Sequence, residues 1–133
     1  ETEQLRQRSI YLPIVRGAIP PALAIFDFPN PDLVTGERAT TTVPVQALFM
    51  MNSPFVREMA ETIGAQFNKT ELSVEDIIQQ LYQRILIREA DANDISVGYK
   101  YVTRLMSNGK SQQEAIGLFV QILFSSTEFR FIQ

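Results

Sequence analysis

From Pro44 to the end of the chain, apolar residues recur at spacings of three and four, which is typical of helices that bury one face. Helix-start signals precede these stretches: Ser53 with Pro54, Ser73 with Asp76, Asp91 or Asn93, and Ser111 with Glu114. The pattern predicts five helices: Val45–Met51, Pro54–Phe67, Val74–Ile87, Asp94–Ser107 and Gln112–Phe124. Short loops join the last three, so neighbours are expected to run antiparallel and pack as a small bundle.

Two of these helices allow more detailed expectations. In helix 74–87 the apolar stripe is clearest, and Leu81 is expected at the centre of the core. In helix 94–107 five side chains are expected to face inward: Ile95, Tyr99, Val102, Leu105 and Met106. Asn108 and Gly109 then provide a left-handed cap that ends this helix.

The first third of the chain has a different texture. All seven prolines fall within the first 54 residues, which favours extended segments and turns with short helical pieces. The predicted fold is therefore all-α: a small helical bundle (residues 43–133) with a proline-rich extended N-terminal arm (residues 1–42), one domain overall. The arm is too apolar for a solvated linker. We expect residues 21–28 to wrap the bundle, burying Phe26 and Phe28, and residues 9–15 to form an interface.

Composition narrows the possible chemistry. The chain has 133 residues and no Cys, His or Trp, which excludes thiol nucleophiles, imidazole bases and disulfides. With 12 Lys and Arg against 15 Asp and Glu the net charge is −3, so nucleic acid is not an expected partner. The longest apolar stretches are about ten residues, half of what a membrane span needs. No catalytic motif is present, and the catalytic residues, if any, are unknown.

No cofactor is expected in this chain. Haem would need a Cys-x-x-Cys-His attachment or an axial His, and the remaining candidate ligands are methionines that we expect to fill the core: Met50, Met51, Met59 and Met106. Asp27, Asn30 and Asp32 concentrate oxygen ligands that calcium prefers. Beside Pro29 and Pro31, the same residues are typical of turns, and we expect no metal there.

A cluster in and beside the arm is a candidate docking site. It comprises Arg8, Tyr11, Arg16 and Arg38, with Thr40, Thr41, Thr42 and Gln46. Arginine forks there could clamp a carboxylate or a neighbouring domain, whereas the alternative is that these arginines are solvated or cap helix carboxyl ends. With Asp27 and Asp32, they are the candidate binding residues.

Several long strings point to a known family. RSIYLP at the start, FDFPNPD, TTVPVQALFMMNSPFV, LYQRILIREA and the closing LFSSTEFRFI span nearly the whole chain. Together they resemble the planctomycete-specific C-terminal domain of unknown function, although Ile87 replaces the usual Gly before Arg88. The resemblance implies an exported, extracytoplasmic parent protein with an upstream c-type cytochrome-like region, and upstream domains of that parent as partners. It implies no reaction.

The segment from LYQRIL to SSTEF also resembles a widespread small helical module, with the order tyrosine, arginine, Gly-Lys-Ser and Ser-x-Glu-Phe. Two functional hypotheses follow. The first is a non-catalytic structural or interaction domain that docks on upstream domains. The second is that the chain contributes part of a carbohydrate-binding or enzymatic cleft formed jointly with the upstream domain.

Overall fold

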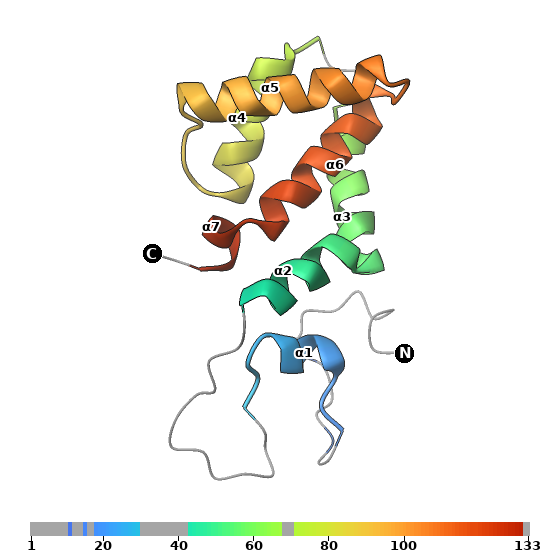
Figure 1. Cartoon of the computed structure of the whole chain (residues 1–133), viewed down its shortest axis with the longest axis vertical. Coiled ribbons are helices and arrows are strands. Elements are labelled where there is room, and N and C mark those ends of the chain that lie inside the picture. Colours follow the sequence, from blue (N-terminus) through green and yellow to red (C-terminus); the bar gives the residue numbers. More distant parts are fainter. Residues whose placement is uncertain (1–10, 12–14, 16–17, 30–42, 68–70, 132–133) are drawn as a thin grey trace. The chain divides into compact units, whose positions relative to one another are not determined.

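The computed structural model describes residues 11, 15, 18–29, 43–67 and 71–131, and these residues form an all-α structure (Figure 1). The helices among them are α1 (Pro21–Ile25), α2 (Val43–Asn52), α3 (Pro54–Ala65), α4 (Val74–Ile85), α5 (Ala92–Ser107), α6 (Gln112–Ser125) and α7 (Thr127–Arg130). The all-α prediction is confirmed, and each of the five predicted helices ends within two residues of its expected position. The short helices α1 and α7 were not predicted.

The chain divides into two compact units, residues 1–49 and 50–133, which we describe separately. In the first, α1 begins with Pro21 at its first position, where the missing N–H costs nothing. The side chain of Gln46 donates to the carbonyl of Ile25 (3.2 Å). Phe26 meets Phe49 edge to face, with ring centroids 5.7 Å apart. Phe26 nevertheless stays exposed and Phe28 is only half-buried, so the prediction that both are buried was wrong.

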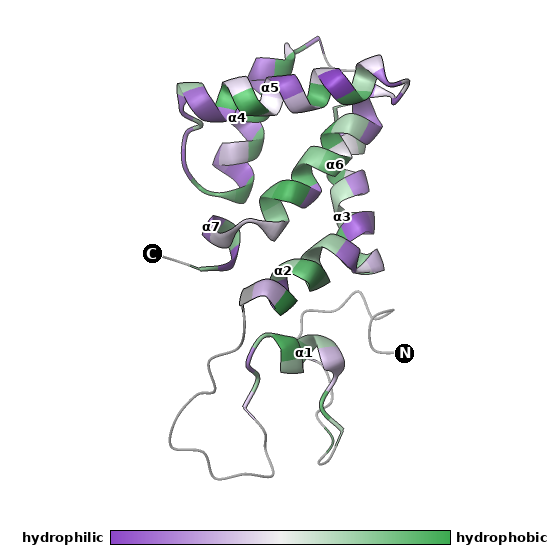
Figure 2. Cartoon of the chain, viewed as in Figure 1, coloured by the Kyte–Doolittle hydropathy of each residue, from purple (hydrophilic) through white to green (hydrophobic). Residues whose placement is uncertain are grey.

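The core of the second unit is built around α6, most of whose residues are apolar (Figure 2). Helices α3, α4 and α5 all pack against it. Leu81, on α4, is completely buried, as predicted. Phe119 of α6 lies between two tyrosine rings, with centroid distances of 6.4 Å to Tyr82 and 6.2 Å to Tyr101.

Helices α3 and α6 cross at two glycines. A Cβ added at Gly64 would lie 2.6 Å from the carbonyl oxygen of Gln113 and 2.9 Å from the backbone nitrogen of Gly117. A Cβ at Gly117 would meet its nearest atoms at 3.4 Å, which is ordinary contact. Only glycine at position 64 therefore permits this backbone-to-backbone packing.

The inward face of α5 differs from the prediction. Tyr99 and Met106 are exposed, whereas Gly98 is buried and Tyr101 is half-buried. The reason is the close approach at Gly98, where an added Cβ would lie 2.9 Å from Phe119 and 3.0 Å from Ile78. Of the methionines, Met51 is exposed as well and Met59 is half-buried, so they do not fill the core as expected.

Most predicted caps are present. Asp91 with Asp94 and Ser111 with Glu114 form complete capping boxes, and the Ser73 hydroxyl accepts from the Asp76 backbone N–H. Gly109 has φ +87°, and the two backbone bonds that close a Schellman motif run from Gly109 to Met106 and from Lys110 to Leu105.

Ser53 is an exception among the caps. It occupies the N-cap position of α3 but makes no capping bond, and its buried Oγ has no hydrogen-bond partner in the part of the chain that the structure describes.

Candidate functional site

The docking cluster predicted from the sequence can be placed only in part. Its members outside the described residues are Arg8, Arg16, Asp32 and Arg38, with Thr40, Thr41 and Thr42. Tyr11 is exposed, Asp27 is half-buried, and Gln46 is buried with its amide on the Ile25 carbonyl. Gln46 therefore ties α2 to α1, and the docking role of the cluster stays a prediction.

Asp27 ends helix α1. Its φ is +60°, and the N–H groups of Asp27 and Phe28 donate to the carbonyls of Ala24 (3.3 Å) and Leu23 (3.0 Å). This is the bonding of a Schellman motif with Asp in the left-handed position, in agreement with the turn interpretation. No group of three or more acidic residues that could hold a metal ion occurs among the described residues, and Asn30 and Asp32 lie outside them.

A polar cluster that the sequence analysis did not predict surrounds Arg88. Arg88, in the turn after α4, donates through Nε and Nη2 to both carboxylate oxygens of Glu128 on α7 and through Nη1 to Asp94 on α5 (2.7 Å). Its guanidinium also lies over the Tyr82 ring, 4.9 Å from the centroid, and the Tyr82 hydroxyl donates to Asp94 (3.2 Å). Helices α4, α5 and α7 therefore meet at one arginine.

The electrostatics of this cluster favour fixed charges. Burial on its own acts to raise the pKa of Asp94, but hydrogen bonds from Arg88 and the Asp91 backbone N–H outweigh it and leave that pKa lowered. Glu128 and Asp94 raise the pKa of Arg88, and burial together with Asp94 raises the pKa of Tyr82 to about 12. The shifts move the pKa of Asp94 further below neutral pH and those of Tyr82 and Arg88 further above it, so these three groups are poorly suited to proton transfer near neutral pH.

A signal for this cluster was present in the sequence. The order tyrosine, arginine and Ser-x-Glu-Phe corresponds to Tyr82, Arg88 and Ser126–Phe129. Ser126 caps α7 by accepting from the Phe129 backbone N–H, and Glu128 binds Arg88. The spacing in that resemblance therefore reflects an ion pair as well as caps.

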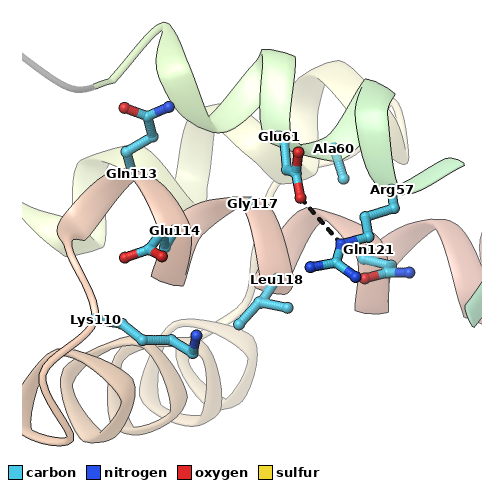
Figure 3. Close-up of a pocket in the computed structure, with 9 residues that line it drawn as sticks. All are labelled: Arg57, Ala60, Glu61, Lys110, Gln113, Glu114, Gly117, Leu118 and Gln121. Carbon is cyan, nitrogen blue, oxygen red and sulfur yellow. Dashed lines mark hydrogen bonds and ion pairs between the residues drawn. The ribbon is translucent and has the colours of Figure 1, made fainter. Parts of the chain in front are cut away.

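Two neighbouring pockets lie along α6 within residues 50–133. The first is lined by Arg57, Ala60, Glu61, Lys110, Gln113, Glu114, Gly117, Leu118 and Gln121 (Figure 3). Figure 3 shows Arg57 and Gln121 at one end and Lys110 with Glu114 toward the other, with Gly117 between them. The lining residues carry two cations and two carboxylates and no histidine or cysteine, so this pocket is equipped for polar recognition.

The second pocket is mostly apolar. It is lined by Met51, Tyr101, Leu118, Gln121, Ile122, Ser125 and Ser126. The side chains of Met51 and Ile122 remain 58% and 45% exposed, although both are apolar. Gln121 fixes the position of Met51 by donating to its carbonyl (2.7 Å). Asp27 lines neither pocket.

Comparison with known proteins yields a family but no characterised relative. A family model described as "Protein of unknown function (DUF1553)", PSD1, matches residues 1–102. No curated protein and no solved structure matches significantly. Within the described residues, no helix is both long enough and apolar enough to cross a membrane.

Proposed function

The chain belongs to the DUF1553 family of proteins of unknown function, and we propose that it serves there as a non-catalytic structural and interaction domain that docks on other domains of its parent protein. The observation that carries this proposal is a contrast between two sets of side chains: the polar cluster at Arg88 is paired internally, whereas apolar side chains beside a pocket are exposed. Arg88, Asp94 and Glu128 satisfy one another, whereas Met51 and Ile122 leave apolar surface uncovered. Uncovered apolar surface next to a groove is typical of an interaction site.

The source and location of the parent protein are part of the same proposal. The resemblance to the planctomycete-specific domain supports an extracytoplasmic parent with an upstream c-type cytochrome-like region. A net charge of −3 and the exposed apolar groups favour a protein partner over nucleic acid. Cell fractionation with an antibody against the parent protein tests the location.

Photo-crosslinking in the intact parent protein tests the docking role. A benzophenone amino acid is placed at Ile122 in one sample and at Val97 in another, since Val97 is also an exposed β-branched residue but lines neither pocket. We expect crosslinks from position 122 to peptides of other domains and few from position 97. Equal crosslinking from both positions, or none beyond residues 1–133 from either, would contradict the docking role.

The same sample also tests the joint cleft. If the crosslinked peptides contain a cluster of acidic and aromatic residues, and a soluble oligosaccharide prevents the crosslink, the chain contributes to a carbohydrate-binding cleft instead. Neither described pocket has an aromatic platform beyond the half-buried Tyr101, so we expect the oligosaccharide to have no effect.

A further inference from the structure

The turn between α5 and α6 contains the pair Asn108–Gly109, the one place in the sequence where glycine follows asparagine. Asparagine is among the heat-labile residues of proteins, because its side-chain amide can react with the backbone nitrogen of the next residue. Glycine in that next position leaves the nitrogen unhindered, since it has no Cβ. The pair is therefore a candidate site of chemical modification.

Both residues of the pair are open to solvent. Asn108 and Gly109 are exposed, and a Cβ added at Gly109 would meet no atom within 4 Å apart from its chain neighbours. The side-chain amide of Asn108 makes no hydrogen bond to any residue that the structure describes. Neither packing nor hydrogen bonding therefore holds this side chain in place.

The backbone of the turn restrains the pair instead. Asn108 is the C-cap residue of α5, with φ −87° and ψ 15°. The N–H of Gly109, whose nitrogen would attack the amide, donates to the carbonyl of Met106 (3.0 Å), and the N–H of Lys110 donates to the carbonyl of Leu105 (3.2 Å). The reaction therefore requires this cap to open first.

Opening of the cap is a local event. Every residue from 106 to 110 is exposed, and none of them belongs to the buried core. Helix ends with few buried contacts open at a much smaller cost in free energy than the core does. The cap therefore slows the reaction without preventing it.

We propose that Asn108 is a site of spontaneous deamidation, controlled by opening of the α5 cap. The backbone nitrogen of Gly109 attacks the Cγ of Asn108, a new C–N bond forms, the bond from Cγ to the amide nitrogen breaks, and ammonia leaves with the proton of the backbone nitrogen. Water then opens the resulting cyclic imide at either of its carbonyls. The two steps consume one water, release one ammonia and need no oxidant or cofactor.

The products, aspartate and isoaspartate at position 108, change the turn between α5 and α6. Each adds a negative charge at the C-terminal end of α5, where the helix dipole is already negative. In isoaspartate the main chain runs through the side-chain carbons, which adds an atom to the backbone. The bonds from Gly109 and Lys110 cannot both keep their geometry around that insertion. The isoaspartate form therefore loses the cap that ends α5.

The pair Asn93–Asp94 is a matched control at the other end of α5. Asn93 is exposed as well, but the N–H of Asp94 donates to the Asp91 side chain (2.7 Å) within a capping box. The Asp94 carboxylate also accepts from Arg88 (2.7 Å), so opening of this end disrupts the polar cluster. We therefore expect Asn93 to react far more slowly than Asn108, although both are exposed.

Ageing of the purified whole chain tests the site. The protein is kept at mildly alkaline pH, and trypsin in heavy-oxygen water then releases residues 105–110 and 89–100, so that deamidation during digestion is distinguished by its isotope. Mass spectrometry follows the replacement of amide nitrogen by oxygen. We expect at least about tenfold faster deamidation in 105–110, which corresponds to about 1.4 kcal/mol in the activation barrier. Equal rates in the two peptides would overturn the proposal.

Unfolding separates the effect of the cap from that of the sequence. In the chain unfolded with guanidinium nothing restrains Gly109, so we expect Asn108 to react about tenfold faster than in the folded chain. Equal rates in the folded and unfolded chains would overturn the control assigned to the cap.

Two variants identify the reacting side chain. Asn108→Gln should abolish the mass change in 105–110, because the longer side chain closes a ring poorly, whereas Asn93→Gln should leave that change as it is. Persistence of the mass change in Asn108→Gln would overturn the assignment to Asn108.

The aged protein also shows the structural consequence. Anion exchange separates the modified chain by its additional negative charge, and thermal unfolding is measured on the fraction rich in isoaspartate. We expect its Tm to fall by about 2–4 °C, the effect of losing one helix cap in a domain of this size. A Tm equal to that of the unmodified chain would contradict the loss of the cap.

Discussion

The guanidinium of Arg88 and the carboxylate of Glu128 form an ion pair with two hydrogen bonds across a sequence separation of 40 residues. The pair holds α7 against the turn that follows α4. A helix of four residues has no stability of its own, so α7 depends on this pair, on the Ser126 cap and on the contact of Phe129 with Phe124 (centroids 5.0 Å apart).

Arg88→Ala should lower the free energy of unfolding by about 1–2 kcal/mol, because it removes charge-assisted bonds and leaves the Asp94 carboxylate, 17% exposed, without its cation. Arg88→Lys should recover only part of the loss, since an ammonium cannot make both bonds to Glu128. Urea unfolding measures both. The matched control is Arg57→Ala, which removes an ion pair whose side chains, Arg57 and Glu61, are 69% and 60% exposed. A comparable loss of stability in Arg57→Ala would contradict the structural role assigned to Arg88.

The two crossing glycines should respond differently to the same substitution. Gly64→Ala should destabilise the bundle by about 2 kcal/mol or more, because the new Cβ would meet the backbone of α6 at 2.6 Å. Gly117→Ala should be neutral or stabilising, because its contacts are ordinary and alanine favours the helix. Thermal unfolding distinguishes the two, and equal shifts in Tm would show that the helices are not packed at this register.

Ile87→Gly should raise the free energy of unfolding by about 1 kcal/mol. Ile87 has φ +57°, a strained value for a β-branched residue, and its side chain is 88% exposed and loses no packing. Gly109→Ala, at φ +87° with open space around it, makes the reverse change and should destabilise by a similar amount. A loss of stability in Ile87→Gly would mean that the side chain has an intramolecular partner.

Leu81→Ala should cost about 2–5 kcal/mol, since the side chain is completely buried at the centre of the core. Val97→Ala, at an exposed position of another helix, should change stability by less than about 0.5 kcal/mol. Chemical denaturation provides both values, and a cost below about 1 kcal/mol at Leu81 would place that face outside the core.

Stability should fall in acid partly through Asp94. Because its pKa is lowered in the folded state, its contribution is present above the unfolded pKa, about 3.9, and is lost as the pH falls through the lower folded value. The difference in unfolding free energy between the wild type and Asp94→Asn should therefore be largest near neutral pH and shrink below about pH 4. A difference independent of pH would show that the carboxylate charge contributes nothing.

Local signals in the sequence were sufficient for most of the helices. Caps and apolar spacing act within one or two turns, which is why α3 to α6 were predicted with Leu81 at the centre. The prediction of which face of α5 is buried was wrong because the apolar pattern assigns no weight to Gly98. The absence of a side chain there lets Phe119 approach. Likewise, Ser53 satisfied the pattern of a cap but its hydroxyl is buried.

The polar cluster and the two pockets along α6 depend on contacts between distant parts of the chain. Arg88 and Glu128 are 40 residues apart, and without the resemblance to the small helical module no local pattern links them. The residues that line the two pockets likewise come from separate parts of the chain. The candidate docking residues in and beside the arm were predicted from residue type and from their place in or next to a proline-rich segment, and the structure describes only Tyr11, Asp27 and Gln46 of them.

The position of Phe119 between Tyr82 and Tyr101 provides the protein with an intrinsic optical probe. The chain has no Trp and four Tyr, so its near-ultraviolet circular dichroism comes chiefly from tyrosine. Two of the four rings are held in asymmetric surroundings by Phe119, whereas Tyr11 and Tyr99 are exposed. The tyrosine band therefore reports on the packing of α4, α5 and α6, and it can follow the loss of this core without any added label.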